Sequence, residues 1–363
     1  MAVLPTDVIT GILRVLPVKT LTRFKCVSKS WDSLIKDPHF VKLHLHHSLT
    51  TNNNVKLVLD DRTNVYVKEE EDENDDDDDE NEDYDETYSV DFDSLDNLEQ
   101  LSRPLISAGS GFWIFGSCNG LLAVRHEEES GTAVWNPSTR TCHYVPRLKG
   151  GEKDYDILGF GYDVIGDDYK VVRIKGVGKS AMIYSLKTDS WKRIKDCPYE
   201  IPYTSPHDGA YANGSLHWVG DENGRQRVIF GLDLGAEEFH RVPEPDVRFR
   251  NLGYKSVGVL GGSLYTICYD GDHISMWVMK ESWTELVYLS REEWELTGIY
   301  YTRAVAYSRR GDEILFDDGG ASHLAWLNLE KKTGQNLRII PGAPARFSAM
   351  IYVESLVSAL PMP

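Results

Sequence analysis

The phrase "AVWNPSTRTCHYVP" at residues 133–146 recurs in altered form along most of the chain. Each copy has an apolar run, a polar turn and a second run that contains aromatic or apolar residues. When one position of each copy is aligned, successive copies lie 45 to 50 residues apart, at Asp91, Asn136, Ser185, Asp233, Val278 and Asn328. This period is typical of a β-propeller, in which each blade is a four-stranded sheet.

A second phrase precedes several of these copies, as "CNGLLAV" (118–124), "ANGSLHWV" (212–219) and "LGGSLYTI" (260–267). In each, a turn with glycine leads into a strand. Six copies of the first phrase predict six blades. The run "FSAMIYVESLVSAL" (347–360) is expected to close the ring, together with residues 54–67. An irregular β-sandwich whose hairpins resemble one another by chance is the alternative architecture.

Residues 4–47 have a different pattern, which predicts three short helices. Apolar residues from Val8 to Leu16 follow the helical period, a second apolar stripe runs from Leu21 to Ile35, and a third helix begins near Phe40. A segment of about 44 residues cannot bury this much apolar surface by itself. Part of that surface is therefore expected to face a partner.

The net charge of −18 is concentrated in one segment. Residues 69–86, "EEEDENDDDDDENEDYDE", hold 15 acidic side chains, and without them the net charge is −3. A nucleic-acid partner is not expected, because such a partner requires a basic surface. Repulsion between like charges predicts that this insertion is solvated and disordered. The alternative is an electrostatic tether for a basic partner.

The start "MAVLPTDVIT" lacks a basic segment followed by a long apolar one, so no signal peptide is expected. The chain has no apolar run of 18 residues, and no membrane span is predicted. The five cysteines are odd in number and widely spaced, which favours buried thiols in a reducing compartment. The expected location is therefore the cytoplasm, the nucleus or both.

No catalytic residue, metal site or cofactor is predicted. The segment "KGVGKS" (175–180) lacks the first glycine of a phosphate-binding loop, because that position is Arg173. In the acidic run, Glu80 stands where a calcium-binding loop needs glycine. The spacing of His44, His46 and His47 does not suit a metal. The tryptophans within the repeated phrases are expected to pack the blades.

The segment "LPTDVITGILRVLPVKTLTRFKCVSKSWDSLIKDPHF" resembles an F-box, a helical module that docks onto a Skp adaptor. The resemblance lies in two Leu-Pro pairs, a Val-Ser-Lys-x-Trp run and a later Pro-x-Phe, and it covers residues 3–43. It implies an F-box at 1–47. The residues at the motif positions, and so the predicted adaptor-binding set, are Leu4, Pro5, Ile9, Leu13, Leu16, Pro17, Leu21, Val27, Ser28 and Trp31.

The remainder, residues 48–360, is similar to the F-box-associated, kelch-like domain of plant F-box proteins. The phrases that carry this resemblance include "FGSCNGLLAV", "VWNPSTR", "GFGYDVIGDDYKVVRI" and "YSLKTDSWKRI". The chain most resembles the group named for constitutive expression of pathogenesis-related genes, and the S-locus F-box proteins are also similar. The acidic insertion and the short junction "MKESW" depart from the usual pattern.

The resemblance implies a non-catalytic substrate receptor of an SCF-type, cullin-based ubiquitin ligase. The helices would bind the Skp adaptor and, through it, cullin, while the propeller would bind a protein target for degradation, with a role in immune-receptor turnover. The alternatives are an S-locus-type receptor for a pollen–pistil ribonuclease, a scaffold outside any ligase and a propeller enzyme. Loops at 199–207, 249–254 and 292–301 supply the candidate target-binding residues, which are Tyr199, Tyr203, Phe249, Arg250, Tyr254, Tyr300 and Tyr301.

Overall fold

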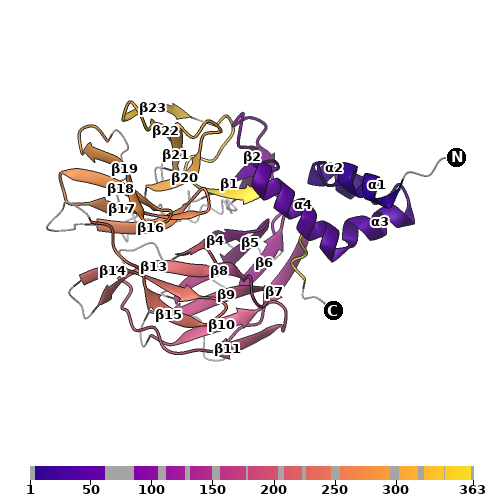
Figure 1. Cartoon of the computed structure of the whole chain (residues 1–363), viewed down its shortest axis with the longest axis horizontal. Helices are drawn as coiled ribbons and strands as arrows, with labels where there is room; N and C mark the ends of the chain where they lie inside the picture. The colour runs from indigo at the N-terminus through magenta and orange to yellow at the C-terminus, as the bar shows by residue number, and fades with distance from the viewer. Residues whose placement is uncertain are drawn as a thin grey trace, which may run out of the picture.

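The chain forms four N-terminal helices followed by an all-β domain (Figure 1). This computed structural model describes residues 5–61, 86–104, 112–126, 131–148, 156–176, 179–202, 208–222, 226–246, 254–294, 302–317, 323–338 and 340–360. The helices stand on one side of the β domain, which has a β-propeller-like arrangement.

The helices are α1 (Thr6–Leu13), α2 (Val18–Phe24), α3 (Lys29–Lys36) and α4 (Pro38–Thr51). The prediction of three helices is wrong, because the second predicted stripe is divided between α2 and α3. The division occurs at Ser28, whose side chain accepts a hydrogen bond from the Trp31 N–H at 3.2 Å and caps α3. Asp37 caps α4 in the same way. The predicted boundary after residue 47 lies inside α4.

Among the described residues, the β domain contains four sheets of four strands and one sheet of eight. The first four-stranded sheet joins both ends of the domain, in the order β24 (Phe347–Val353), β1 (Val55–Asp61), β2 (Thr87–Asp91) and β3 (Glu99–Gln100). The other four-stranded sheets follow chain order. They are β4 (Phe112–Cys118), β5 (Leu121–His126), β6 (Thr132–Asn136) and β7 (Thr141–Val145); β16 (Tyr254–Leu260), β17 (Ser263–Tyr269), β18 (His273–Met279) and β19 (Trp283–Ser290); and β20 (Arg303–Tyr307), β21 (Glu313–Asp317), β22 (Leu324–Asn328) and β23 (Thr333–Arg338).

The eight-stranded sheet consists of two runs of four consecutive strands. They are β8 (Asp156–Asp163), β9 (Asp168–Lys175), β10 (Ala181–Ser185) and β11 (Ser190–Arg193), and β12 (Asp208–Ala212), β13 (Ser215–Glu222), β14 (Gln226–Asp233) and β15 (Glu238–Arg241). Within each run the neighbours are antiparallel. The runs meet where β8 pairs with β12 in parallel, through the residue pairs Asp208–Leu158 and Gly209–Gly159.

The six aligned positions of the repeated phrase all lie at or near the end of the third strand of a four-strand set. Five of them begin the same kind of turn, in which the side chain accepts a hydrogen bond from a main-chain N–H two or three residues later. The exception is Val278, where the short junction noted in the sequence forms a tighter hairpin between Met279 and Trp283. The repeated phrase is therefore the third strand, its turn and the fourth strand.

Tryptophans of the repeated phrases link neighbouring four-strand sets, as well as packing within them. Trp191 Nε1 donates to the Pro146 carbonyl at 2.6 Å, and Trp283 Nε1 donates to the Pro243 carbonyl at the same distance. Each proline follows the outer strand of the preceding set. Trp218, which is buried, donates to the Leu158 carbonyl at 3.3 Å. The expectation that these tryptophans pack the blades is thus confirmed for Trp191, Trp218 and Trp283.

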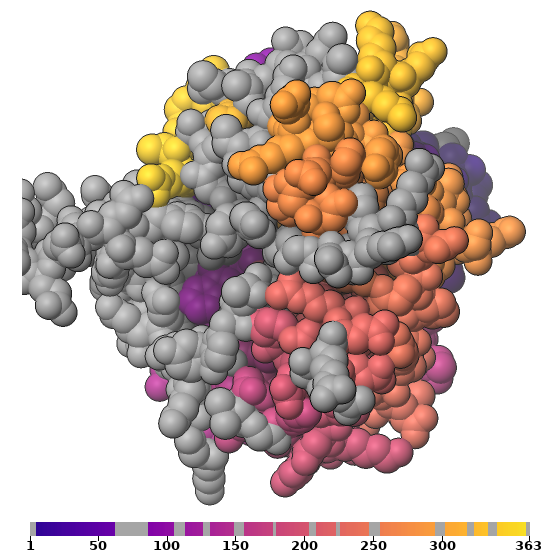
Figure 2. Space-filling model, turned by 90° about the vertical axis from the view of Figure 1, so that its left-hand side faces the viewer, coloured from indigo at the N-terminus to yellow at the C-terminus, as the bar shows by residue number. Residues whose placement is uncertain are grey.

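The propeller has two distinct sides. Helix α4 ends at Thr51 and β1 begins at Val55, so the start of β1 lies on the side that carries the helices (Figure 1). Because neighbouring strands of a set are antiparallel, the turns between first and second strands and between third and fourth strands share this helix side. The connections between second and third strands, and those between sets, begin and end on the opposite side, which Figure 2 shows.

Candidate functional site

The helical module has its own small core, which contains part of the predicted adaptor-binding set. Leu13 and Leu21 are fully buried, together with Val18, Ile35 and Phe40. These side chains hold the helices together and offer no surface to a partner. Ile9, Leu16 and Trp31 pack against the same core and are half-buried.

Four other residues of the predicted set, namely Pro5, Pro17, Val27 and Ser28, are exposed. The two prolines precede α1 and α2, and Ser28 caps α3, so these three residues define helix starts. Val27 is an exposed apolar side chain between α2 and α3. Leu4 lies outside the described residues.

The structure adds an apolar row that the family motif did not include. Val8, Ile12 and Val15 are 45%, 51% and 51% exposed, and they are spaced as residues on one face of α1 and its continuation. The spacing of four and three residues was visible in the sequence. The sequence did not show that this row lies on the exposed face of the helix, because burial depends on the packing of α2, α3 and α4. An exposed apolar row of this kind is a candidate interaction surface.

The three candidate target-binding loops all connect one four-strand set to the next. They lie between β11 and β12, between β15 and β16, and between β19 and β20. Their ends are therefore on the side opposite the helices (Figure 2). Of the named residues, Tyr203, Phe249, Arg250, Tyr300 and Tyr301 are outside the described residues. Tyr254 begins β16.

Tyr199, the remaining candidate for target binding, is part of the domain core. It is buried and stacks on Phe230, with 4.6 Å between ring centroids. Its neighbour Glu200 pairs with Asp221 at the end of β13 through main-chain hydrogen bonds. The aromatic ring of Tyr199 therefore anchors the start of its loop and leaves little surface for a target.

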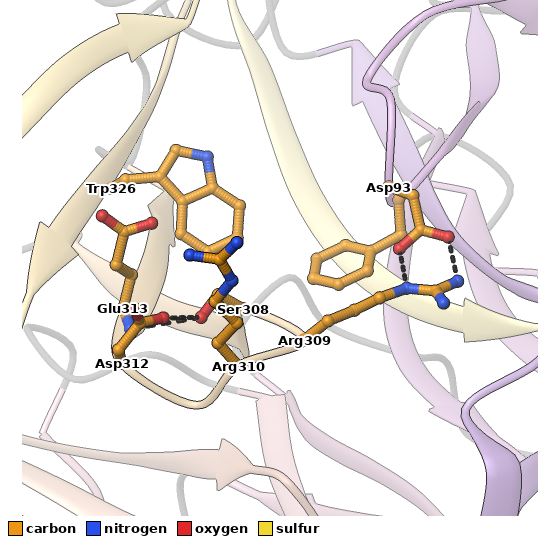
Figure 3. Close-up of a pocket in the computed structure, with 8 residues that line it drawn as sticks. Asp93, Ser308, Arg309, Arg310, Asp312, Glu313 and Trp326 are labelled. Atoms are coloured by element: carbon orange, nitrogen blue, oxygen red, sulfur yellow. Dashed lines mark hydrogen bonds and ion pairs between the residues drawn. The ribbon is translucent and has the colours of Figure 1, made fainter.

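A pocket of about 630 Å³ lies where the first and last four-stranded sheets meet (Figure 3). The turn after β2 supplies Phe92 and Asp93, and the turn between β20 and β21 supplies Arg309. Asp93 and Arg309 form an ion pair through two hydrogen bonds. The rings of Phe92 and Trp326 lie 6.2 Å apart. Both turns belong to the helix side, so this pocket lies at the ring-closing seam and away from the candidate target loops.

Two histidines are buried, and their burial lowers the pKa of each. The Nε2 of His44 donates to the Leu16 carbonyl at 2.9 Å, and this bond joins α4 to the connection between α1 and α2. Burial also lowers the pKa of His217 to about 4. Within the described part of the chain, no group of histidine, cysteine and carboxylate side chains is arranged to hold a metal ion.

All five cysteines are free thiols. Cys118, Cys197 and Cys268 are buried, whereas Cys142 is partly exposed and Cys26 is exposed. The expectation that all five are buried is therefore wrong for Cys26, which lies between α2 and α3 on the small helical module. Among the described residues, no helix is both long and apolar enough to cross a membrane.

Comparison with known proteins places both modules. Residues 1–45 match the F-box-like family model, and residues 84–351 match the model of the F-box associated beta propeller domain. "F-box protein CPR1" of Arabidopsis thaliana is 32% identical, over 98% of this chain and 89% of that protein. "F-box/kelch-repeat protein At3g23880" of the same plant is 28% identical, over 78% of this chain and 79% of its own length.

A solved structure supports the fold alone. A chain of the crystal structure of the nidogen/laminin complex superimposes with a TM-score of 0.50 at 10% sequence identity. The superposition covers 83% of this chain and 99% of the other.

Proposed function

The chain belongs to the family of F-box proteins that carry an F-box associated β-propeller domain, and we propose that it is a substrate-recognition subunit of an SCF-type cullin-RING ubiquitin ligase. In this role the F-box binds a Skp adaptor and, through it, cullin. The propeller binds a protein target. The chain performs no bond chemistry itself, and ubiquitin transfer gains from the high local concentration of the target.

The observation that carries the proposal is the exposed apolar row Val8, Ile12 and Val15. Other side chains fill the core of the helical module, and these three are not part of it. Apolar anchors that are buried on binding supply most of the energy of a typical protein interface. The half-buried Ile9, Leu16 and Trp31 border the module's core, and we assign them a mixed role in packing and adaptor contact.

The two-sided arrangement of the propeller supports a separate target surface. The F-box occupies the helix side, and the connections between four-strand sets open on the opposite side. A target bound there leaves the adaptor surface of the F-box free. We propose that the propeller binds a protein target for degradation in plant immune-receptor turnover, as the resemblance to the group named for constitutive expression of pathogenesis-related genes implies.

We also propose that the β domain has six blades of the kelch-like type. The eight-stranded sheet would then count as two blades, β8 to β11 and β12 to β15. Only two residue pairs join these runs, whereas β8 and β9 are paired along eight residues. The repeated phrase falls once in each of the six four-strand sets. We place the boundary between the modules at the junction of α4 and β1, and we place the protein in the cytoplasm or nucleus.

The test is binding of the purified chain to a purified Skp adaptor, measured by calorimetry beside an Ile12→Asp variant. An aspartate in the centre of an apolar interface loses the favourable free energy of burying the isoleucine side chain. Its carboxylate also adds a desolvation penalty. We expect the native chain to bind, and Ile12→Asp to weaken binding by at least about 100-fold, which corresponds to about 3 kcal/mol.

The matched control is Leu49→Asp, because Leu49 is 46% exposed on the same module but lies near the end of α4. This variant should bind as the native chain does. Because Ile12 and Leu49 are both exposed, both variants should keep the native helix content. The proposal is wrong if the native chain fails to bind the adaptor. The choice of surface is wrong if Ile12→Asp binds normally.

A further inference from the structure

The segment that follows β24 contacts both the helical module and the β domain. Residues 354–360 leave the innermost strand of the first sheet on the helix side, and Figure 1 shows this segment passing between the helices and the β domain. The Glu354 N–H donates to the Asn54 carbonyl at 2.8 Å, which ties the segment to the junction between α4 and β1. We call residues 354–360 the strap.

The propeller holds the strap through Asn136. The Nδ2 of Asn136 donates to the carbonyls of Ser355 at 3.1 Å and Val357 at 2.7 Å. Its Oδ1 accepts from the Ser138 N–H at 2.8 Å and so makes the turn after β6. Ser355 is fully buried, and Gly120 passes so close that a β-carbon there would lie 2.2 Å from the Ser355 Oγ.

The equivalent residues of other turns explain the amide at position 136. Asp91 and Asp233 make the same turn with a carboxylate. A carboxylate cannot donate, so it could not hold two carbonyls of the strap. Beyond Val357, Ala359 is buried in the core of the propeller, and its N–H donates to Thr141 Oγ1 at 3.2 Å.

The F-box holds the strap through Leu356. This side chain is buried in the same cluster as Leu13, Leu21 and Phe40, so a residue from the far end of the sequence completes the core of the helical module. Ser355 and Val357, on either side of Leu356, are bound by Asn136. The strap is thus a direct physical link between the two cores.

Two ion pairs also bridge the modules, but they are weaker candidates for this link. Lys42 and Asp167 are 59% and 40% exposed, and Lys19 and Glu99 are 65% and 55% exposed. Exposed pairs are screened by solvent and salt and contribute little. The buried contacts of Leu356 and Asn136 are therefore the ones that can fix one orientation.

We infer that the strap sets the orientation of the F-box on the propeller, and that it thereby fixes where a bound target stands relative to the ligase. This inference rests on the proposed function for its consequence, but its structural part does not. Leu356 and Asn136 act as positioning residues. Neither belongs to the apolar row proposed for the adaptor.

The structural part is tested by a distance measurement between two spin labels in the full chain. One label replaces Ser33 on α3 and the other replaces Thr188 in the turn after β10. Both sites are exposed, and the two cysteines that are not buried, Cys26 and Cys142, are changed to serine. We expect a single narrow distance distribution. Asn136→Asp and Leu356→Ala should each broaden it, one acting from the propeller and the other from the F-box.

Two matched variants control for local damage. Asn328→Asp changes the equivalent turn residue of another four-strand set, whose Oδ1 makes the same turn. Leu360→Ala removes an apolar side chain that belongs to the strap but is 49% exposed. Both should keep the narrow distribution. The inference is overturned if Asn136→Asp and Leu356→Ala also keep it while the native fold is retained by circular dichroism.

The functional part uses the self-modification of the chain in a reconstituted ligase. With a fixed orientation, only lysines within reach of the ubiquitin-loaded conjugating enzyme should be modified. Mass spectrometry identifies these lysines. Loosening the strap should spread modification to further lysines without a change in adaptor affinity. An unchanged lysine pattern would contradict the positioning role. A native chain that binds no adaptor would overturn the proposed function, while the distance measurement would still decide the role of the strap.

Discussion

At the scale of single residues, His217 links the stability of the propeller to pH. Its ring is buried in β13, and its Nδ1 donates to the Ala210 carbonyl at 3.2 Å. Burial, with a smaller contribution from the nearby His240 ring, lowers its pKa to about 4. An unfolded chain has a histidine pKa of about 6.5, so between these values the folded state binds fewer protons than the unfolded state.

We therefore predict that His217 contributes stability that is fully present above about pH 6.5 and is lost as the pH falls toward 4. At pH 5.5 the loss is about 1 kcal/mol relative to pH 7.5. His217→Gln keeps an N–H donor for Ala210 but does not titrate. In urea unfolding followed by tryptophan fluorescence, the native chain should lose more stability than the variant between these two pH values. Equal losses would show that His217 is not held neutral.

Small residues decide whether Trp218 can fill the seam between β8 and β12. A β-carbon at Gly159 would lie 2.8 Å from the indole ring, and one at Gly209 would lie 2.7 Å from it. These glycines are also one of the two residue pairs that join the strands. The tryptophan was recognisable in the sequence as a packing residue. The need for glycine at both positions was not, because the residues are about 50 positions apart and only folding brings them together.

At the scale of elements, the repeated turn stabilises the outer hairpin of most four-strand sets. Asp233 illustrates it, because its Oδ1 accepts from the N–H groups of Gly235 at 2.8 Å and Ala236 at 2.7 Å. The main chain then adopts a left-handed conformation at Glu237, with φ of 57°. Leu95, Arg140, Asp189 and Lys332 have the same conformation at the equivalent place of their turns.

We predict that Asp233→Ala destabilises the chain by about 1 kcal/mol, because two main-chain donors lose their acceptor at a partly exposed site. Urea unfolding at neutral pH measures this change. The control is Lys280→Ala in the tighter hairpin after β18, which should change the stability by less than about 0.5 kcal/mol. A loss of similar size in both variants would mean that the side-chain acceptor has no particular role.

At the scale of the whole molecule, the ring is closed by strands from opposite ends of the chain. β24 pairs with β1 along seven residue pairs, from Val55–Val353 to Asp61–Phe347. The next seam is also fixed, because the Ala349 N–H donates to Asp317 Oδ2 of β21 at 2.9 Å. Without β24 the first sheet would lose its innermost strand, and both β1 and the last sheet would lose their neighbour.

We therefore predict that a chain ending at residue 346 shows no cooperative thermal unfolding, whereas a chain ending at Val353 keeps a single transition at a lower temperature. The second chain retains β24 and lacks the strap, so it is the matched control for ring closure. Differential scanning calorimetry with near-ultraviolet circular dichroism distinguishes the two cases. A native-like transition in the shorter chain would show that β24 is dispensable for closing the ring.

The sequence by itself determined the class of each module, because that information is local and repeated. Helical spacing predicted a helical module, the Leu-Pro pairs and the Val-Ser-Lys-x-Trp run gave its resemblance to an F-box, and the spacing of one turn phrase predicted the propeller-like repeat. The same turn chemistry at Asp91, Asn136, Asp233 and Asn328 explains why the repeat was visible. The number of helices was missed because Ser28 acts as a cap only when the chain before it leaves the helix.

The tertiary structure alone decided which apolar residues of the F-box stay outside its core and which residues join the two modules. Leu13 and Ile12 are neighbours in the sequence, yet one is buried and the other is half exposed, since burial depends on where α2 to α4 pack. Leu356 joins the core of the F-box although more than 300 residues separate it from α4. Such contacts follow from ring closure, which brings the end of β24 beside the start of β1, and no local pattern in the sequence records them.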